Sequence, residues 1–235
     1  MTLLLGDFHV HSTFSDDAVS TVDENIAAAA ERGLTHLRLI DHVRADTAWV
    51  PEFVSTVEGA HRPDGLSIVT GVETKIMDAT GRLDLPPSLT GIDAVVIADH
   101  QFPGPAGPWT PTETRARLDD GLSVDDALDL LISGYIAAMA SLPGSQLAHA
   151  FSILPKVGLS VADLSDEHLR AWVGAASTTQ TLVEVNEKWG CPSPRILRAL
   201  ADAGVEIVAS TDSHIASDVG VYDTVVSLLT EAGIA

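Results

Sequence analysis

The chain has 235 residues, of which 33 are acidic and 13 are basic, so its formal charge is −20 with histidine neutral. So acidic a chain can neutralise few phosphates, which argues against a nucleic acid partner and against binding to an anionic membrane surface. With 46% hydrophobic and 20% charged residues, it still has the apolar content of a folded protein with a substantial core.

The single cysteine, Cys191, offers neither an intramolecular disulfide nor a thiolate metal cluster. We expect it to be an unreactive packing residue in a reducing, cytoplasmic setting. The apolar run near the N-terminus is too short for a signal peptide, and no stretch approaches the ~20 apolar residues of a membrane span. The sequence therefore predicts one cytoplasmic domain over residues 1–235, and it leaves the oligomeric state open.

Seven short apolar runs, rich in Val, Ile or Leu, predict seven β-strands. In chain order they are Leu3–His11, Leu37–His42, Ser67–Ile76, Ala94–His100, Gln146–Ala150, Leu182–Glu187 and Glu206–Thr211. Amphipathic segments between most of them predict helices that begin at Thr21, Ser123 and Ser193-Pro194. Alternating strands and helices are typical of a parallel α/β sheet, which periodicity alone leaves either open or closed as a barrel.

The segment Gln101–Gly121 is the least regular part of the chain. It contains four prolines, Pro103, Pro105, Pro108 and Pro111. Long irregular loops in compact domains are usually functional, and this one directly follows a candidate ligand motif. We therefore expect it to act as a lid.

Each predicted strand ends in side chains that can bind a metal. In chain order the motifs are Asp7-Phe8-His9-Val10-His11, Asp41-His42, Gly71-Val72-Glu73, Asp99-His100, Ala148-His149, Glu184-Val185-Asn186 and Asp212-Ser213-His214. The carboxyl ends of parallel strands meet at one face of the fold, so these side chains should lie together. Three other histidines, His36, His61 and His168, follow no such pattern and are expected to be ordinary side chains.

Imidazole and carboxylate ligands without thiolates suit Zn²⁺, Mn²⁺ or Fe²⁺. Eight or nine candidate ligands exceed the four that one ion needs, which indicates two or three divalent ions. Clustered divalent ions serve hydrolysis above other chemistries, with phosphate esters as the obvious substrates.

The order His9-x-His11, Asp41-His42, Glu73, His100, His149 and Asp212-x-His214 resembles the PHP (polymerase and histidinol phosphatase) superfamily over essentially the whole chain. The segment Glu184-Val-Asn-Glu, followed by Pro192-Ser-Pro and Ser210-Thr-Asp-Ser-His, is similar to the histidinol-phosphatase-like members. The resemblance implies a distorted (β/α)7 TIM-like barrel with a trinuclear metal centre at the carboxyl ends of its strands.

When the metal ligands of the family are matched to the motifs of this sequence, the resemblance implies three ligand sets. They are His9, His11, Glu73 and Asp212; then Glu73, His100 and His149; then His42, His214 and an aspartate of the Asp16-Asp17 pair, for which Asp16 is preferred. Glu184 and Asn186 are left open, either as ligands or as residues that orient a ligand.

The function expected on this basis is hydrolysis of a small phosphomonoester by a metal-bridging hydroxide, with His149, Asp212 and His214 at the reacting group. Three cations share the inward parity of a nearby ligand and are candidates for binding the phosphate: Arg44, Lys75 and Lys188. The alternatives are a metal-dependent phosphodiesterase, an amidohydrolase-like enzyme, or a non-catalytic metal-binding regulatory module.

Overall fold

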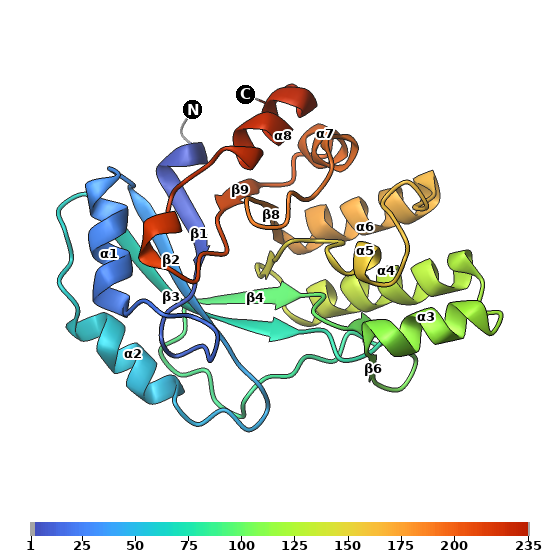
Figure 1. Cartoon of the computed structure of the whole chain (residues 1–235), viewed down its shortest axis with the longest axis horizontal. Helices are drawn as coiled ribbons and strands as arrows, with labels where there is room; N and C mark the ends of the chain where they lie inside the picture. The colour runs from blue at the N-terminus through green and yellow to red at the C-terminus, as the bar shows by residue number, and fades with distance from the viewer. Residues whose placement is uncertain (1–2, 235) are drawn as a thin grey trace.

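The computed structural model describes residues 3–234 and contains a seven-stranded parallel sheet that curves into a nearly closed barrel (Figure 1). Every neighbouring pair in the sheet is parallel. In spatial order the strands are β1 (Gly6–Val10), β2 (His36–His42), β3 (Ser67–Lys75), β4 (Ala94–Ala98), β7 (Gln146–Leu147), β8 (Leu182–Asn186) and β9 (Ile207–Ser210). The predicted α/β fold class, a distorted (β/α)7 barrel, is confirmed.

All of the predicted strands except the second are shorter than expected, the first and the fifth by the most. The first does not begin at Leu3, because Leu3–Leu5 form a 3-10 turn, η1, whose leucines pack against a hydrophobic cluster that includes Leu197 and Leu229. The fifth ends at Leu147 because His149 has a positive φ of 24°. This backbone conformation is incompatible with an extended strand.

Helices surround the barrel (Figure 1). The predicted caps at Thr21 and Ser123 are present, since each side chain accepts a hydrogen bond from the backbone three residues later. Pro194 begins its helix as predicted, although the Ser193 side chain makes no cap hydrogen bond. The helices are α1 (Val22–Glu31), α2 (Val50–Gly59), α3 (Pro111–Asp119), α4 (Val124–Ser141), α5 (Ile153–Lys156), α6 (Asp166–Thr179), α7 (Pro194–Asp202), the 3-10 turn η2 (Ala216–Asp218) and α8 (Thr224–Ala232).

The repeat of strand and helix is irregular in two places. Residues 76–93, between β3 and β4, contain no helix. The connection from β4 to β7 carries a small antiparallel hairpin, β5 (Phe102–Pro103) and β6 (Pro108–Trp109), before α3 and α4. These irregularities account for the distortion of the barrel.

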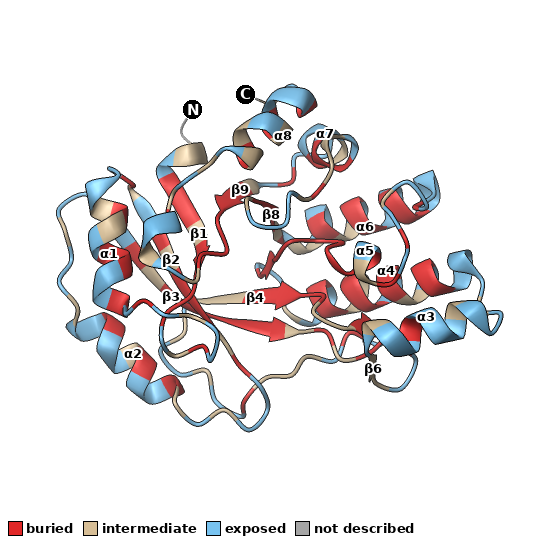
Figure 2. Ribbon diagram, in the orientation of Figure 1, coloured by how far each residue is buried: buried red, intermediate tan, exposed pale blue. Residues whose placement is uncertain are grey.

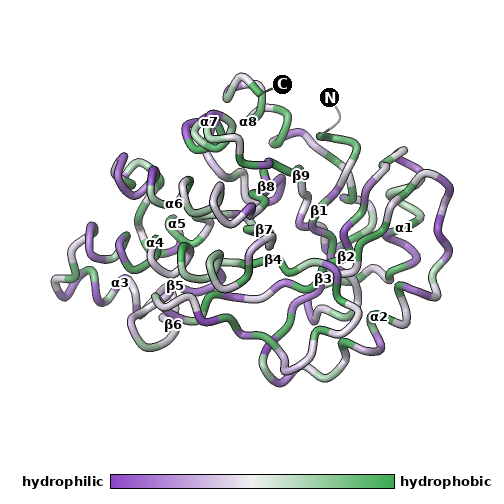
Figure 3. The backbone as a smooth tube through the Cα atoms, turned by 180° about the vertical axis from the view of Figure 1, so that it is seen from behind, coloured by the Kyte–Doolittle hydropathy of each residue, from purple (hydrophilic) through white to green (hydrophobic). Residues whose placement is uncertain are grey.

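The core lies between the strands and the inward faces of the helices, where buried residues concentrate (Figure 2). The largest cluster joins α4 and α6 to the sheet and contains Tyr135, Phe151 and Trp172, with the rings of Phe151 and Trp172 4.9 Å apart. Hydrophilic and hydrophobic residues alternate along α1 and α2 (Figure 3), as expected of helices with one face on the barrel. Within residues 3–234, no helix has both the length and the apolar character needed to cross a membrane.

Asp7 ties the first strand to the last. Its carboxylate accepts hydrogen bonds from the backbone and hydroxyl of Thr211, at 3.0 and 2.6 Å, and from the backbone of Gly220 at 2.9 Å. The adjacent backbones add one bridge between Val10 and Ser213. Because β1 and β9 share so few backbone hydrogen bonds, the hydrogen bonds of the Asp7 carboxylate provide much of the contact that closes the barrel.

Burial raises the pKa of Asp7 from 3.8 to about 6, although its hydrogen bonds oppose this shift. The raised pKa means that Asp7 favours folding most below pH 4, and that this contribution is lost as the pH rises through about 6. In the metal-free protein, we therefore expect Asp7→Asn to destabilise the fold by about 2 kcal/mol more at pH 4 than at pH 7. Urea titrations of both proteins at the two pH values measure this, and an equal effect at both would contradict it.

Candidate metal centre

Six histidines and two carboxylates meet at the carboxyl ends of the strands. All but His9 and His11 line a cavity of about 420 Å³. The eight residues come from the ends of six strands or the loops after them, with two at β1, two after β9 and one each at β2, β3, β4 and β7. The residues are His9, His11, His42, Glu73, His100, His149, Asp212 and His214. The structure thus brings together every predicted ligand except Asp16, the preferred aspartate of the Asp16-Asp17 pair.

Glu73 lies at the centre of this cluster and is only 1% exposed. One carboxylate oxygen, Oε1, lies 3.1 Å from His100 Nε2 and 3.2 Å from His149 Nε2. The other, Oε2, lies 2.8 Å from His42 Nδ1. Burial raises the pKa of Glu73, but the surrounding imidazoles, led by His100 and His9, hold it well below its usual range. The carboxylate is therefore ionised.

Three buried ligand atoms in this cluster lack a well-oriented hydrogen bond: His9 Nε2, His11 Nε2 and Glu73 Oε2. Glu73 Oε2 lies close to His42 Nδ1, but the contact does not have hydrogen-bond geometry. The two ring nitrogens lie 3.5 and 3.6 Å from Glu73 Oε2, and His11 Nε2 lies 3.2 Å from Asp212 Oδ1. Two ligands bound at about 2.1 Å to one tetrahedral ion would lie about 3.4 Å apart. The residues present therefore fit a divalent cation, which would satisfy polar atoms that the protein leaves unpaired.

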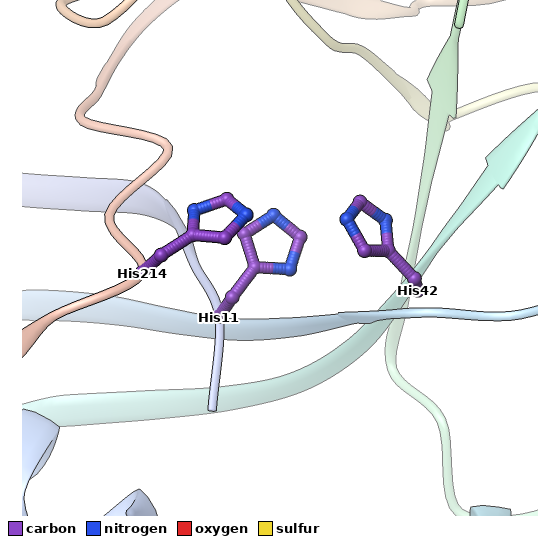
Figure 4. A group of neighbouring side chains, drawn as sticks. All are labelled: His11, His42 and His214. Carbon is purple, nitrogen blue, oxygen red and sulfur yellow. The ribbon is translucent and has the colours of Figure 1, made fainter. Parts of the chain in front are cut away.

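A second group of ring nitrogens comes from His11, His42 and His214, with one nitrogen of each within 4.8 Å of the others. Figure 4 shows the three rings converging from separate parts of the chain. Asp17 lies beside them, with its oxygens 3.2 Å from His214 Nε2 and 3.6 Å from His42 Nε2.

The position of the turn favours Asp17 over the predicted Asp16 as the ligand. Asp16 faces a separate hollow with Phe14, whereas Asp17 lines the cavity of the cluster. The reason is Ser15, whose backbone and hydroxyl both donate to Asp41 Oδ1, at 3.1 and 2.6 Å. With Ser15 held inward, the turn carries Asp16 outward and Asp17 back towards the histidines.

Carboxylates hold the outward nitrogens of several imidazoles. Glu184, whose role the sequence leaves open, lies 3.1 Å from His9 Nδ1, and Asn186 donates to Glu184 at 2.7 Å. Asp99 lies 3.4 Å from His149 Nδ1. Partners of this kind fix the ring orientation and leave the other nitrogen free for a metal. Glu184 thus lies behind a candidate ligand, and Asn186 supports Glu184.

Two of the candidate ligands have strained backbones. His149 and Asp212 adopt positive φ angles of 24° and 53°, a region that costs a non-glycine residue about 1–3 kcal/mol. Both follow a strand end, and the left-handed turn directs their side chains into the cluster. Such strain is common at functional sites.

Trp189 belongs to the site although no feature of the sequence indicated it. Its indole N–H donates to Asp212 Oδ2 at 2.6 Å, which leaves Oδ1 facing His11. The Lys156 ammonium lies 4.0 Å from the centre of the indole ring, and both residues line the cavity. Neither position carries a recognisable spacing from a ligand, so only the fold places them here.

The three cations predicted to bind phosphate, Arg44, Lys75 and Lys188, all line the cavity. Lys75 is paired with Asp84 at 3.3 Å. Lys188 lies 3.6 Å from Asp212 Oδ2 and 3.2 Å from His214 Nδ1. Lys156 is a fourth cation at the same opening.

Most of the segment predicted to be a lid lies away from the cavity. Of residues 101–121, only Gln101 is among those that line it. The hairpin β5–β6 packs on α4 and α3, and Arg117 lies 4.1 Å from the centre of the Trp109 ring. The structure therefore shows an ordered packing segment where the sequence predicted a lid.

A parallel barrel with an imidazole and carboxylate cluster at the carboxyl ends of its strands is the architecture of TIM-like metal-dependent hydrolases. The chain belongs to the PHP domain family, whose pattern matches residues 7–188. The predicted family is thus confirmed.

Relatives extend over nearly the whole chain. A probable phosphatase of Shewanella sediminis is 26% identical over 235 residues, covering 97% of this chain and 85% of its own length. A probable phosphatase of Thermoanaerobacter sp. is 24% identical over 245 residues and covers 100% of this chain and 88% of its own length. The predicted enzyme class, a hydrolase of phosphoric ester bonds, agrees with these names.

Among solved structures, the histidinol phosphate phosphatase of Lactococcus lactis, crystallised with zinc, L-histidinol and phosphate, superposes with a TM-score of 0.68 at 16% identity, covering 97% of this chain and 92% of that chain. The histidinol phosphatase described as putative from Listeria monocytogenes superposes with a TM-score of 0.56 at 16% identity, covering 92% of this chain and 97% of that one. These similarities show the fold.

The pKa values of the cluster predict that metal uptake releases protons. Burial lowers the pKa of His149, but hydrogen bonds to Asp99 and Glu73 outweigh this and raise it to about 10. Burial likewise lowers the pKa of His9, and the charges of Glu184 and Glu73 leave it raised. Both rings are therefore protonated at pH 7 in the metal-free protein, and each must lose a proton to bind a metal through Nε2.

We expect Zn²⁺ binding at pH 7 to release at least one proton per protein, and the apparent affinity to fall as the pH is lowered. Calorimetry in two buffers of different ionisation enthalpy measures the number released. Binding without proton release would show that the ion does not use these rings.

Proposed function

We propose that the protein hydrolyses a small phosphorylated metabolite, a phosphomonoester, with two or three divalent ions held by the cluster. The observation that carries this proposal is the group of buried, unpartnered ligand atoms around the ionised carboxylate of Glu73. Imidazole and carboxylate ligands suit Zn²⁺, Mn²⁺ and Fe²⁺. When bound, such ions activate water at neutral pH and offset the charge of phosphoryl oxygens.

The distances support the three ligand sets that the resemblance implies, each with one or two carboxylates, with Asp17 taken in place of Asp16. Glu73 belongs to two of them because its oxygens face different histidines. The sets are His9, His11, Glu73 and Asp212; Glu73, His100 and His149; and His42, His214 and Asp17.

The protein's own cations would bind the phosphate. Four basic side chains line one cavity in a chain that has 13 in all. Lys75 pairs with Asp84, which is outside the ligand sets, whereas the acidic partner of Lys188 is Asp212, which would itself bind a metal. Arg44, Lys156 and Lys188 are therefore the better candidates. Their ammonium and guanidinium groups would hold the non-reacting oxygens of the phosphate and orient the ester.

The three residues predicted to be catalytic all line the cavity, and His214 is the most exposed of them. Its side chain is 18% exposed, against 1% for His149 and 5% for Asp212. We assign His214 to the position beside the leaving group. His149 and Asp212 would act through their contacts with Glu73 and His11.

The direct test combines elemental analysis with phosphate release. We expect the purified protein to contain two or three equivalents of Zn, Mn or Fe, and to release phosphate from a phosphomonoester in preference to a diester or a lactone. Because the Lactococcus lactis enzyme was crystallised with L-histidinol and phosphate, histidinol phosphate is the first substrate to assay. Glu73→Gln should lose both the metal and the activity, whereas bound metal without turnover of any ester would favour a non-catalytic module.

Replacing Lys188 should weaken substrate binding without removing the metal. We expect Lys188→Ala to raise KM about tenfold or more, because one charge-assisted contact to phosphate is lost. Arg195→Ala, which removes an ion pair to Asp166 on the surface, is the matched control and should leave KM unchanged. Loss of metal in Lys188→Ala would contradict the assigned role.

A further inference from the structure

A chain of hydrogen bonds crosses the interior of the barrel and ends at a ligand of the cluster. Arg38 on β2 donates from Nη1 to Gln146 Oε1 on β7 at 2.9 Å. Gln146 donates from Nε2 to Glu184 Oε2 on β8 at 3.0 Å. Glu184 Oε2 in turn lies 3.1 Å from His9 Nδ1 on β1. Four strands that are distant in sequence are thus joined through side chains alone.

The chemistry of the first and third groups sets the direction of the whole chain. A guanidinium can only donate hydrogen bonds, so the amide oxygen of Gln146 must face Arg38. The amide nitrogen then faces Glu184, and it also donates to the backbone oxygen of Phe8 at 3.1 Å. An ionised carboxylate can only accept, so the neutral ring of His9 must carry its proton on Nδ1.

In the neutral ring that binds a metal, this direction leaves the lone pair of His9 on Nε2. That nitrogen is buried, has no hydrogen-bond partner and lies 3.5 Å from Glu73 Oε2. It is the atom that the ligand set requires. The order of donors and acceptors from Arg38 to Glu184 therefore fixes the neutral ring of His9 in the tautomer that can bind a metal through Nε2.

Glu184 is held on both oxygens. Besides Gln146 and His9 on Oε2, the backbone N–H of His149 and the side-chain amide of Asn186 donate to Oε1. Three donors, from Gln146, His149 and Asn186, thus hold the two oxygens as hydrogen-bond acceptors. Removing the Gln146 donor would leave a buried oxygen underpaired and free to move away from His9.

Arg38 is not explained by an ordinary ion pair. Among residues 3–234 it forms no direct salt bridge with a carboxylate, and its Nε is buried without a partner. Its guanidinium lies 4.8 Å from the centre of the Phe8 ring. Burying the Arg38 guanidinium has a desolvation cost. The one side-chain hydrogen bond of Arg38 among residues 3–234 is the bond that orients Gln146.

We propose that Arg38 and Gln146 are positioning residues for metal binding, which act through Glu184 to hold His9 with Nε2 free and aimed at the ion. The inference rests on the proposed function in one respect, namely that His9 binds a metal. Neither Arg38 nor Gln146 lines the cavity, so neither would touch the substrate. Their effect should therefore appear first in metal affinity.

The experiment measures Zn²⁺ affinity by competition with a chromophoric chelator, and the folding of each variant by circular dichroism and urea titration. Gln146→Met keeps the side-chain volume but removes the hydrogen-bond donor. We expect the Zn²⁺ affinity of this variant, at the site with the lowest affinity, to be about 10–100-fold lower than that of the parent protein. Gln146→Glu keeps the contact with Arg38 but sets a carboxylate against Glu184, so its loss should be at least as large. Arg38→Met should weaken binding in the same direction, and Arg38→Lys, which can still donate to Gln146, should restore it to within about threefold.

Arg195→Met is the control for loss of an arginine elsewhere on the fold, and its Zn²⁺ affinity should equal that of the parent. If the Gln146 and Arg38 variants lose stability but bind Zn²⁺ as the parent does, their role is structural and the proposal is overturned. Where Gln146→Met does not fold, the Zn²⁺ affinity of Gln146→Glu decides the question. A parent protein that binds no Zn²⁺, Mn²⁺ or Fe²⁺ would instead refute the proposed function.

Discussion

The buried carboxylate of Glu73 is the constraint on which the rest of the site depends. An isolated charge in a protein interior is strongly unfavourable unless opposite charge lies close to it. Here that charge comes from the imidazoles on both of its oxygens, or from cations bound in their place. Because the ring nitrogens must all point inward to serve one carboxylate, each ring needs its other nitrogen held from behind.

A set of buried acids at other strand ends provides that support. Glu184 holds His9, Asp99 holds His149, and Asp41 holds Ser15, whose hydroxyl lies 3.2 Å from His11 Nδ1. Asp7 has the same character but joins β1 to β9. Closure of the barrel and orientation of the ligands are thus achieved by the same kind of interaction, a buried carboxylate that accepts several hydrogen bonds.

The net charge of −20 suggests that the protein repels an anionic substrate, but this holds only when charge is averaged over the whole molecule. Arg44, Lys75, Lys156 and Lys188 all line one cavity, and bound divalent ions would add further positive charge there. The acidic surface elsewhere favours solubility, while the field inside the cavity is set locally. A small phosphate ester can therefore approach a protein that would repel an extended polyanion.

The sequence by itself determined the parallel α/β class and identified eight of the side chains that cluster, since strand periodicity and a polar side chain at each strand end are local features of the chain. His9-x-His11 and Asp212-x-His214 could be recognised in this way. The closed barrel was implied by the family resemblance. Tertiary structure alone decided the contacts that have no local signal. The turn at Ser15 selects Asp17 over Asp16, Trp189 reaches Asp212 across two loops, and Arg38 reaches His9 through β7 and β8. These roles depend on which strands become neighbours when the sheet curves, and spacing along the chain does not encode distances between side chains that meet only across a closed barrel.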